Sequence, residues 1–121
     1  MPDIGPVNGV LIYTERLAPM LQFYRDVLGL EPRHVKEHAV NFQWGDFKLT
    51  VALHDGVTGA NADALRIMVN FEVSDIQAVY RRLAGAGAEF SRAPEQEPWG
   101  GWIATFADPD GNTLQLLQVP G

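Results

Sequence analysis

The sequence predicts an α+β domain built of two βαβββ modules, and two observations support this fold class. The order of one strand, one helix and three strands occurs twice along the chain. The two expected helices also share a pattern, because Phe23–Glu31 aligns with Val79–Gly87 at an offset of 56 residues. Repetition at about half the chain length is typical of modules that each bury an incomplete core and pair. We place these modules at about residues 5–55 and 64–120 of a single domain, residues 1–121.

The first module begins with a strand over residues 7–14, where Val10–Tyr13 suits a strand buried on both faces. Apolar residues then recur at intervals of three and four from Leu17, which predicts a helix that Gly29 ends. Three short strands follow, with Gly45 and Asp46 as the turn between the last two. These strands are expected at residues 32–38, 39–44 and 47–54.

The second module follows a linker at residues 55–63, which shows no hydrophobic periodicity. Its helix is expected to begin at Ser74 or Asp75, which are good N-caps, and to end at Gly85–Gly87. Strands are expected at residues 65–73, 89–92, 102–107 and 113–118. The segment at residues 93–101 contains two prolines and two glycines, and we expect a loop there that can carry function.

The last of these strands follows a dense turn signal at residues 108–112, where Pro109 fixes φ and Gly111 permits a positive φ. Polar and apolar residues then alternate from Thr113 to Leu116, which is the period of a strand with one buried face. Gln115 is therefore expected on the face opposite to its apolar neighbours.

The composition excludes several classes of protein. The chain has no cysteine, so it has no disulfide, no thiolate metal site and no cysteine nucleophile. Its formal net charge is −6 and its basic residues are scattered, which argues against a nucleic-acid partner. The N-terminus lacks a signal-peptide pattern, and no apolar run approaches the roughly 20 residues that span a bilayer. We expect a soluble cytoplasmic protein with no membrane partner.

Five short segments carry a family resemblance, and they cover nearly the whole chain in a fixed order. They are Phe23–Leu30, Phe71–Ile76, Gly85–Phe90, Pro98–Gly100 and Asp108–Asn112. Together they resemble the signatures of the vicinal oxygen chelate superfamily, which includes glyoxalases, bleomycin-resistance proteins and extradiol dioxygenases. The resemblance implies a U-shaped mixed sheet around a pocket, and commonly a homodimer with exchanged or closely packed modules.

The resemblance does not extend to the metal site. Metal-using members of the superfamily carry ligands at positions that map near Gly9, near Thr50 or Ala52, at Met68 and at Gln115. Of these, only Gln115 offers an oxygen suited to a cation, and one neutral ligand cannot replace the three or more donors of a transition-metal site. We therefore expect no metal and no other cofactor, with a divalent metal as the alternative.

Six residues are candidates for binding a small molecule. Trp99 and Trp102 lie in and just after a loop bounded by proline and glycine, where their rings can line the cavity of a flat ligand. Tyr13 offers a phenol, although a core tyrosine explains it equally well. The remaining candidates are Met68 and Asn70, which share a strand face, and Gln115, whose amide both donates and accepts hydrogen bonds.

Two further residues become candidates only if the protein is an enzyme. His54 lies at the end of its strand, on the face of Thr50 and Ala52, and can act as a base near neutral pH. Glu72 shares the face of Met68 and can act as an acid. The alternatives are a surface histidine and a solvated carboxylate.

The leading hypothesis is metal-independent binding of a small aromatic molecule, as in sequestration of an antibiotic. The first alternative is an enzyme: a metal-dependent lyase, isomerase or dioxygenase, or a metal-free isomerase or lyase that uses His54 and Glu72. A purely structural role, for instance as a dimer scaffold, is the second alternative.

Overall fold

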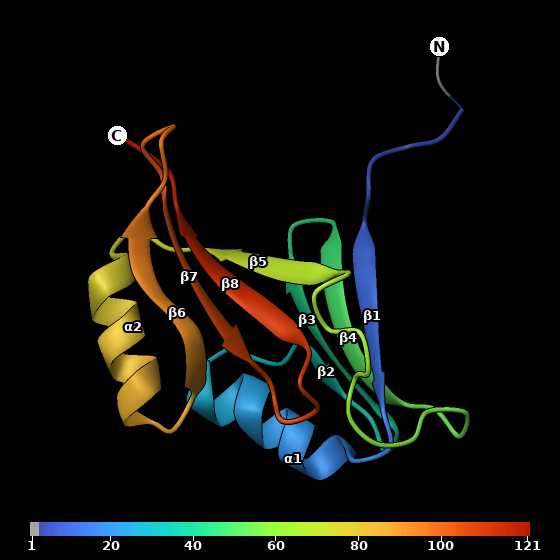
Figure 1. Ribbon diagram of the computed structural model, residues 1–121. Coiled ribbons are helices and arrows are strands. Elements are labelled where there is room, and N and C mark those ends of the chain that lie inside the picture. The colour runs from blue at the N-terminus through green and yellow to red at the C-terminus, as the bar shows by residue number, and fades with distance from the viewer. Residues whose placement is uncertain (1–2) are drawn as a thin grey trace. The chain divides into compact units, whose positions relative to one another are not determined.

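A computed structural model describes residues 3–121, in which the chain forms two compact units, Met1–Gly59 and Ala60–Gly121. Each unit contains a four-stranded mixed sheet and one helical segment (Figure 1). The order of one strand, one helical segment and three strands is the same in both units. The predicted α+β class and its βαβββ modules are therefore confirmed.

The first unit has the sheet order β1-β4-β3-β2, with β1 parallel to β4 and the other pairs antiparallel. Gly45 has a φ of +58°, which suits the predicted tight turn between β3 and β4. The elements in chain order are β1 (Gly9–Thr14), α1 (Leu17–Leu21), η1 (Gln22–Val27), β2 (His34–Val35), β3 (Ala39–Trp44) and β4 (Phe47–Leu53).

The helical segment of the first unit changes its winding part-way. After α1 it continues as the π-helix η1, and the amide of Leu28 donates to the carbonyl of Phe23 at 2.9 Å. The wider turn allows Phe23 and Tyr24, which are consecutive, to be buried together. The helix was predicted in the right place, and Gly29, with a φ of +80°, follows its end.

Two expectations for the strands of the first unit were wrong. Strand β1 is buried on one face only, because Ile12 and Thr14 are buried whereas 60% of Leu11 and 41% of Tyr13 are exposed. The predicted strand at residues 32–38 is reduced to β2, because the chain turns there and the amide of Lys36 donates to the carbonyl of Ala39.

The second unit has the sheet order β5-β8-β7-β6, with β5 parallel to β8. Helix α2 packs on β6, β7 and β8 (Figure 1). The elements are β5 (Met68–Glu72), α2 (Ile76–Gly85), β6 (Glu89–Gln96), β7 (Trp102–Ala107) and β8 (Thr113–Gln118). The buried side chains of this core are Ile76, Leu83, Ala104, Phe106, Leu114 and Leu116. The predicted burial of Leu114 and Leu116, with Gln115 on the opposite face, is confirmed.

Strand β6 is longer than predicted and includes part of the expected loop at residues 93–101. The strand lies at the sheet edge, and two register shifts in its pairing with β7 accommodate Pro94. The guanidinium of Arg92 binds Glu95 at 2.9 Å and Glu97 at 2.8 Å. The hydrogen bonds that Arg92 donates, the one to Glu97 foremost, raise the pKa of its guanidinium. They link residues on the two sides of the register shift after Arg92.

Strand β5 is shorter than predicted, because it begins at Met68 instead of residue 65. The preceding residues form a turn in which Arg66 binds the carboxylate of Asp63 at 2.8 Å. This local ion pair and the hydrogen bond from the amide of Arg66 to the carbonyl of Asp63 keep the segment out of the sheet.

The N-terminus of α2 offers a first test of the local structure. The carboxylate of Asp75 accepts a hydrogen bond from the amide of Ala78 at 3.1 Å, so Asp75 is the N-cap. We expect Asp75→Ala to lower the free energy of unfolding by about 1 kcal/mol, measured by urea denaturation. Asp75→Asn keeps the accepting oxygen and should stay within about 0.5 kcal/mol of the wild type; equal losses in both variants would contradict the cap.

Candidate functional site

The turn before β8 is held by one buried carboxylate. Asp108 is 5% exposed and accepts hydrogen bonds from the amides of Asp110 at 3.0 Å and Asn112 at 2.9 Å. Its second oxygen accepts from the side-chain amide of Asn112 at 2.9 Å. Gly111 has a φ of +79°, which only glycine adopts without strain. The turn thus fixes where β8 begins, and with it the position of Gln115.

Gln115 lies on the face of the second sheet that points away from α2. Its register partners are Asn70 on β5 and Thr105 on β7, so the three side chains lie side by side on that face. The amide nitrogen of Gln115 donates to the hydroxyl of Thr105 at 3.1 Å. We call Asn70, Thr105 and Gln115 the polar strip. Met68 lies on the same strand face as Asn70 and is 40% exposed.

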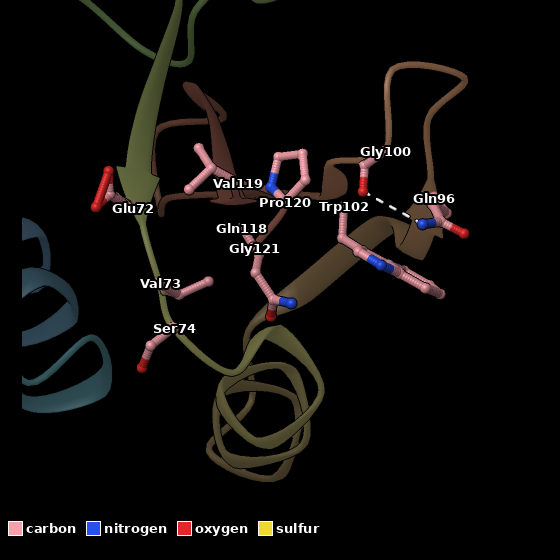
Figure 2. Close-up of a pocket in the computed structure, with 10 residues that line it drawn as sticks. All are labelled: Glu72, Val73, Ser74, Gln96, Gly100, Trp102, Gln118, Val119, Pro120 and Gly121. Carbon is pink, nitrogen blue, oxygen red and sulfur yellow. Dashed lines mark hydrogen bonds between the residues drawn. The ribbon is translucent and has the colours of Figure 1, made fainter.

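Trp102 lies on the other face of the same sheet. It is separated from Thr105 by an odd number of positions along β7, so its side chain shares the face of the buried Ala104 and Phe106. Trp102 lines a cavity of about 550 Å³ within the second unit (Figure 2). The lining residues are Glu72, Val73, Ser74, Gln96, Gly100, Trp102, Gln118, Val119, Pro120 and Gly121. The structure therefore separates Trp102 from Gln115, although the sequence favoured a shared cavity.

The indole of Trp99 packs on the backbone of the turn to which it belongs. A Cβ atom added to Gly101 would lie 1.9 Å from the indole of Trp99, so the ring rests directly on the backbone of this glycine. The indole remains 55% exposed, and among the described residues that line the cavity Trp102 is present but Trp99 is not. The ring therefore has a local packing role, and its contact with a ligand stays a prediction.

Tyr13 and His54 lie together in the first unit. Their ring centroids are 4.9 Å apart and the rings meet edge to face. Nδ1 of His54 accepts a hydrogen bond from the amide of Gly56 at 2.9 Å, and the carboxylate of Asp55 lies 3.6 Å from the same atom. The neutral ring therefore carries its proton on Nε2. Glu72, the other acid–base candidate, belongs to the second unit and is exposed at the end of β5.

A second hollow of about 970 Å³ lies within the first unit, between the N-terminal segment at residues 4–6 and the exposed face of the sheet. Leu11, Lys48 and Thr50 contribute to its lining. Tyr13 is not one of the described lining residues, so the phenol is separate from this hollow.

The residues at the positions that the family resemblance implies for metal ligands do not fit a metal. Gly9 has no side chain, and a Cβ added there would lie 3.0 Å from the carbonyl oxygen of Lys48. Thr50, Ala52 and Met68 offer no carboxylate or imidazole, and Gln115 offers a single neutral amide oxygen. Over residues 3–121, no group of three or more His, Cys, Asp or Glu side chains is placed to hold a metal ion.

Comparison with known proteins decides the family. The sequence model of the Glyoxalase/Bleomycin resistance protein/Dioxygenase superfamily matches residues 7–116. The chain belongs to this superfamily. The resemblance predicted from the five segments is therefore confirmed, and this glyoxalase-superfamily protein contains the βαβββ repeat that the sequence indicated.

Relatives of this glyoxalase-superfamily protein are distant in sequence. "Uncharacterized protein YetH" of Bacillus subtilis is 22% identical over 120 residues, which cover 95% of this chain and 99% of YetH. A glyoxalase-related enzyme from Fulvimarina pelagi matches with a TM-score of 0.78 and 20% identity over 96% of this chain and 89% of that chain. A lactoylglutathione lyase from Agrobacterium tumefaciens matches with a TM-score of 0.75 and 19% identity, over 97% of this chain and 96% of that chain. These structures share the fold.

Three polar residues near the candidate site were not singled out from the sequence. Thr105 orients Gln115, and Gln96 and Gln118 lie in one row with Trp102 across the sheet. The sequence did contain a signal for Gln118, because it lies two residues after Leu116 and therefore places a polar side chain on the buried face of the strand.

Within the described part of the chain, no helix is long and apolar enough to cross a bilayer.

Proposed function

We propose that this glyoxalase-superfamily protein binds a small aromatic molecule on the polar strip without a metal, as in sequestration. The observation that carries this proposal is the neutral hydrogen-bonding pair of Gln115 and Thr105 at a family metal-ligand position. Because Nε2 of Gln115 donates to Thr105, its Oε1 is left to accept a hydrogen bond from a ligand. Asn70 adds a second amide beside it.

The apolar part of this surface is supplied by neighbouring side chains. Met68 is flexible and polarisable, and thioethers make favourable contacts with aromatic rings. Ile103 and Leu117 are register partners on the same face as Thr105 and Gln115. A ring placed on these side chains would be oriented by the amides of the polar strip. Small-molecule sites usually combine an apolar lining with a few polar groups that fix the orientation of the ligand.

The test is equilibrium dialysis of the wild type against a panel of planar aromatic compounds, and we expect saturable binding of at least one of them. Gln115→Glu should weaken that binding about tenfold, because a charged carboxylate replaces the neutral amide at a desolvated contact. Gln43→Glu makes the same chemical change at an exposed residue of the first unit and should leave the affinity unchanged.

Two outcomes would overturn the proposal. Absence of saturable binding across the whole panel would remove the binding function. One equivalent of Zn, Ni, Fe or Mn in protein purified without chelator would instead favour the metal-dependent lyase, isomerase or dioxygenase.

The metal-free isomerase or lyase has less support. Nδ1 of His54 already accepts the amide of Gly56, so a proton transfer by this residue would have to use Nε2. We propose in addition a cytoplasmic homodimer, for which the exposed Leu11 on β1 offers an apolar contact and the cysteine-free sequence suits a reducing compartment.

A further inference from the structure

The last row of the second sheet on its helix side is left uncovered by α2. Gln96, Trp102 and Gln118 are register partners across β6, β7 and β8. Val73 continues the row beyond β5, where its amide donates to the carbonyl of Leu117. The helix begins only at Ile76, so it covers the rows of Ala104 and Phe106 but not this one. The uncovered row forms the floor of the 550 Å³ cavity (Figure 2).

Two contacts hold the segments that line the cavity around Gly100. The ring of Pro120 packs on Gly100, because a Cβ added to this glycine would lie 3.4 Å from Cγ of Pro120. The amide nitrogen of Gln96 donates to the carbonyl of Gly100 at 3.2 Å, which ties the turn before β7 to the end of β6. These contacts fix the positions of the turn at Gly100 and of Pro120, which line the cavity together with Trp102.

Gln118 is oriented by the first residue of the helix. Its Oε1 accepts the amide of Ile76 at 2.7 Å, so the side-chain oxygen is occupied. Figure 2 shows this oxygen directed towards α2 and the Nε2 atom on the side of Trp102. The two N–H groups of Nε2 are therefore available to donate beside an indole face.

We propose that this cavity is a second binding site, for an uncharged planar aromatic compound that carries a carbonyl group. Its ring packs on Trp102 and Pro120, and its carbonyl oxygen accepts from Nε2 of Gln118. No Lys, Arg or His side chain is present among the described lining residues, so the charge of an anionic ligand would be desolvated without a cationic partner. The site lies on the opposite face of the sheet from the polar strip, and it goes beyond the proposed function.

The experiment uses 2-naphthamide as the probe and the full chain in the Trp44→Phe/Trp99→Phe background, in which Trp102 is the only tryptophan. We expect saturable quenching of Trp102 by 2-naphthamide. The anion 2-naphthoate and unsubstituted naphthalene should each bind about tenfold more weakly or worse, because the carboxylate of the first has no cationic partner in the cavity and the second offers no acceptor. Equal affinity for all three probes would overturn the proposal.

Gln118→Glu is the decisive variant. A carboxylate oxygen still accepts the amide of Ile76, so the urea midpoint should not fall, whereas the donor to the ligand is lost. We expect the Kd for 2-naphthamide to rise about tenfold or more. Gln43→Glu is the matched control and should bind as the background does. In equilibrium dialysis, Trp102→Leu should likewise lose the binding.

The two proposed sites can be distinguished. If 2-naphthamide binding survives Gln118→Glu but is lost in Gln115→Glu, the compound binds the polar strip, so the cavity proposal is overturned and the proposed function stands. If binding is lost in Gln118→Glu but survives Gln115→Glu, the cavity proposal is supported whatever the outcome for the polar strip. Absence of any quenching of Trp102 overturns the cavity proposal.

Discussion

Asp108→Ala is expected to lower the free energy of unfolding by about 3 kcal/mol, because it removes three hydrogen bonds to a charged acceptor. Two of the donors are backbone amides, those of Asp110 and Asn112, and Asp108 and Asp110 are only 5% and 4% exposed. Once the carboxylate is gone, the amide of Asp110 loses its acceptor in a buried position. Urea denaturation monitored by circular dichroism measures the loss.

Asp108→Asn is the matched control. An amide oxygen can still accept from the backbone of Asp110 and Asn112, while the contact of the second oxygen with the Asn112 side chain is lost. We expect a loss of about 1 kcal/mol. If alanine cost no more than asparagine, the turn would not depend on this carboxylate.

Phe106→Ala is expected to lower the free energy of unfolding by about 4 kcal/mol, because it leaves a cavity in the core of the second unit. Phe106 is 1% exposed, and its ring centroid lies 5.0 Å from that of Phe90. Phe90 in turn meets Tyr80 of α2 at 4.7 Å, so the three rings connect the sheet to the helix. The change is measured as a lower urea midpoint.

Leu65→Ala removes a side chain that is 74% exposed and serves as the control. It should change the free energy of unfolding by less than about 0.5 kcal/mol. A loss below about 1 kcal/mol for Phe106→Ala would mean that the helix does not depend on this aromatic cluster.

Predictions from the sequence were accurate where a local backbone requirement, such as a helix cap or a positive φ, strongly favours one residue type. Asp75 was expected near the start of a helix and caps α2. Gly111, with its positive φ, and Asp108, with its three bonds, form the expected turn. Strand β8 contains the predicted alternation from Thr113 to Leu116, which reflects one buried face, and it continues to Gln118. These features depend on neighbours in sequence, so the sequence displays them directly.

Side-chain pairing and coverage by other elements explain the features that were missed. Strand β6 runs through Pro94 because Arg92 binds two carboxylates across the bulge, and side-chain pairing of this kind is not visible in a propensity pattern. Strand β1 appeared buried on both faces because its residues are apolar throughout, yet within its unit only one face is covered.

The sequence by itself determined the two-module fold and the turn that positions β8, because each follows from the identity of residues at fixed spacing. It also shows which residues stand at the positions that the resemblance implies for metal ligands. Only the tertiary structure decided which side chains share a face. It set Gln115 beside Thr105 and Asn70, and Trp102 beside Gln118 on the reverse side, because strand register fixes the neighbours of each residue. It also left the last row of the sheet uncovered, because α2 begins only at Ile76.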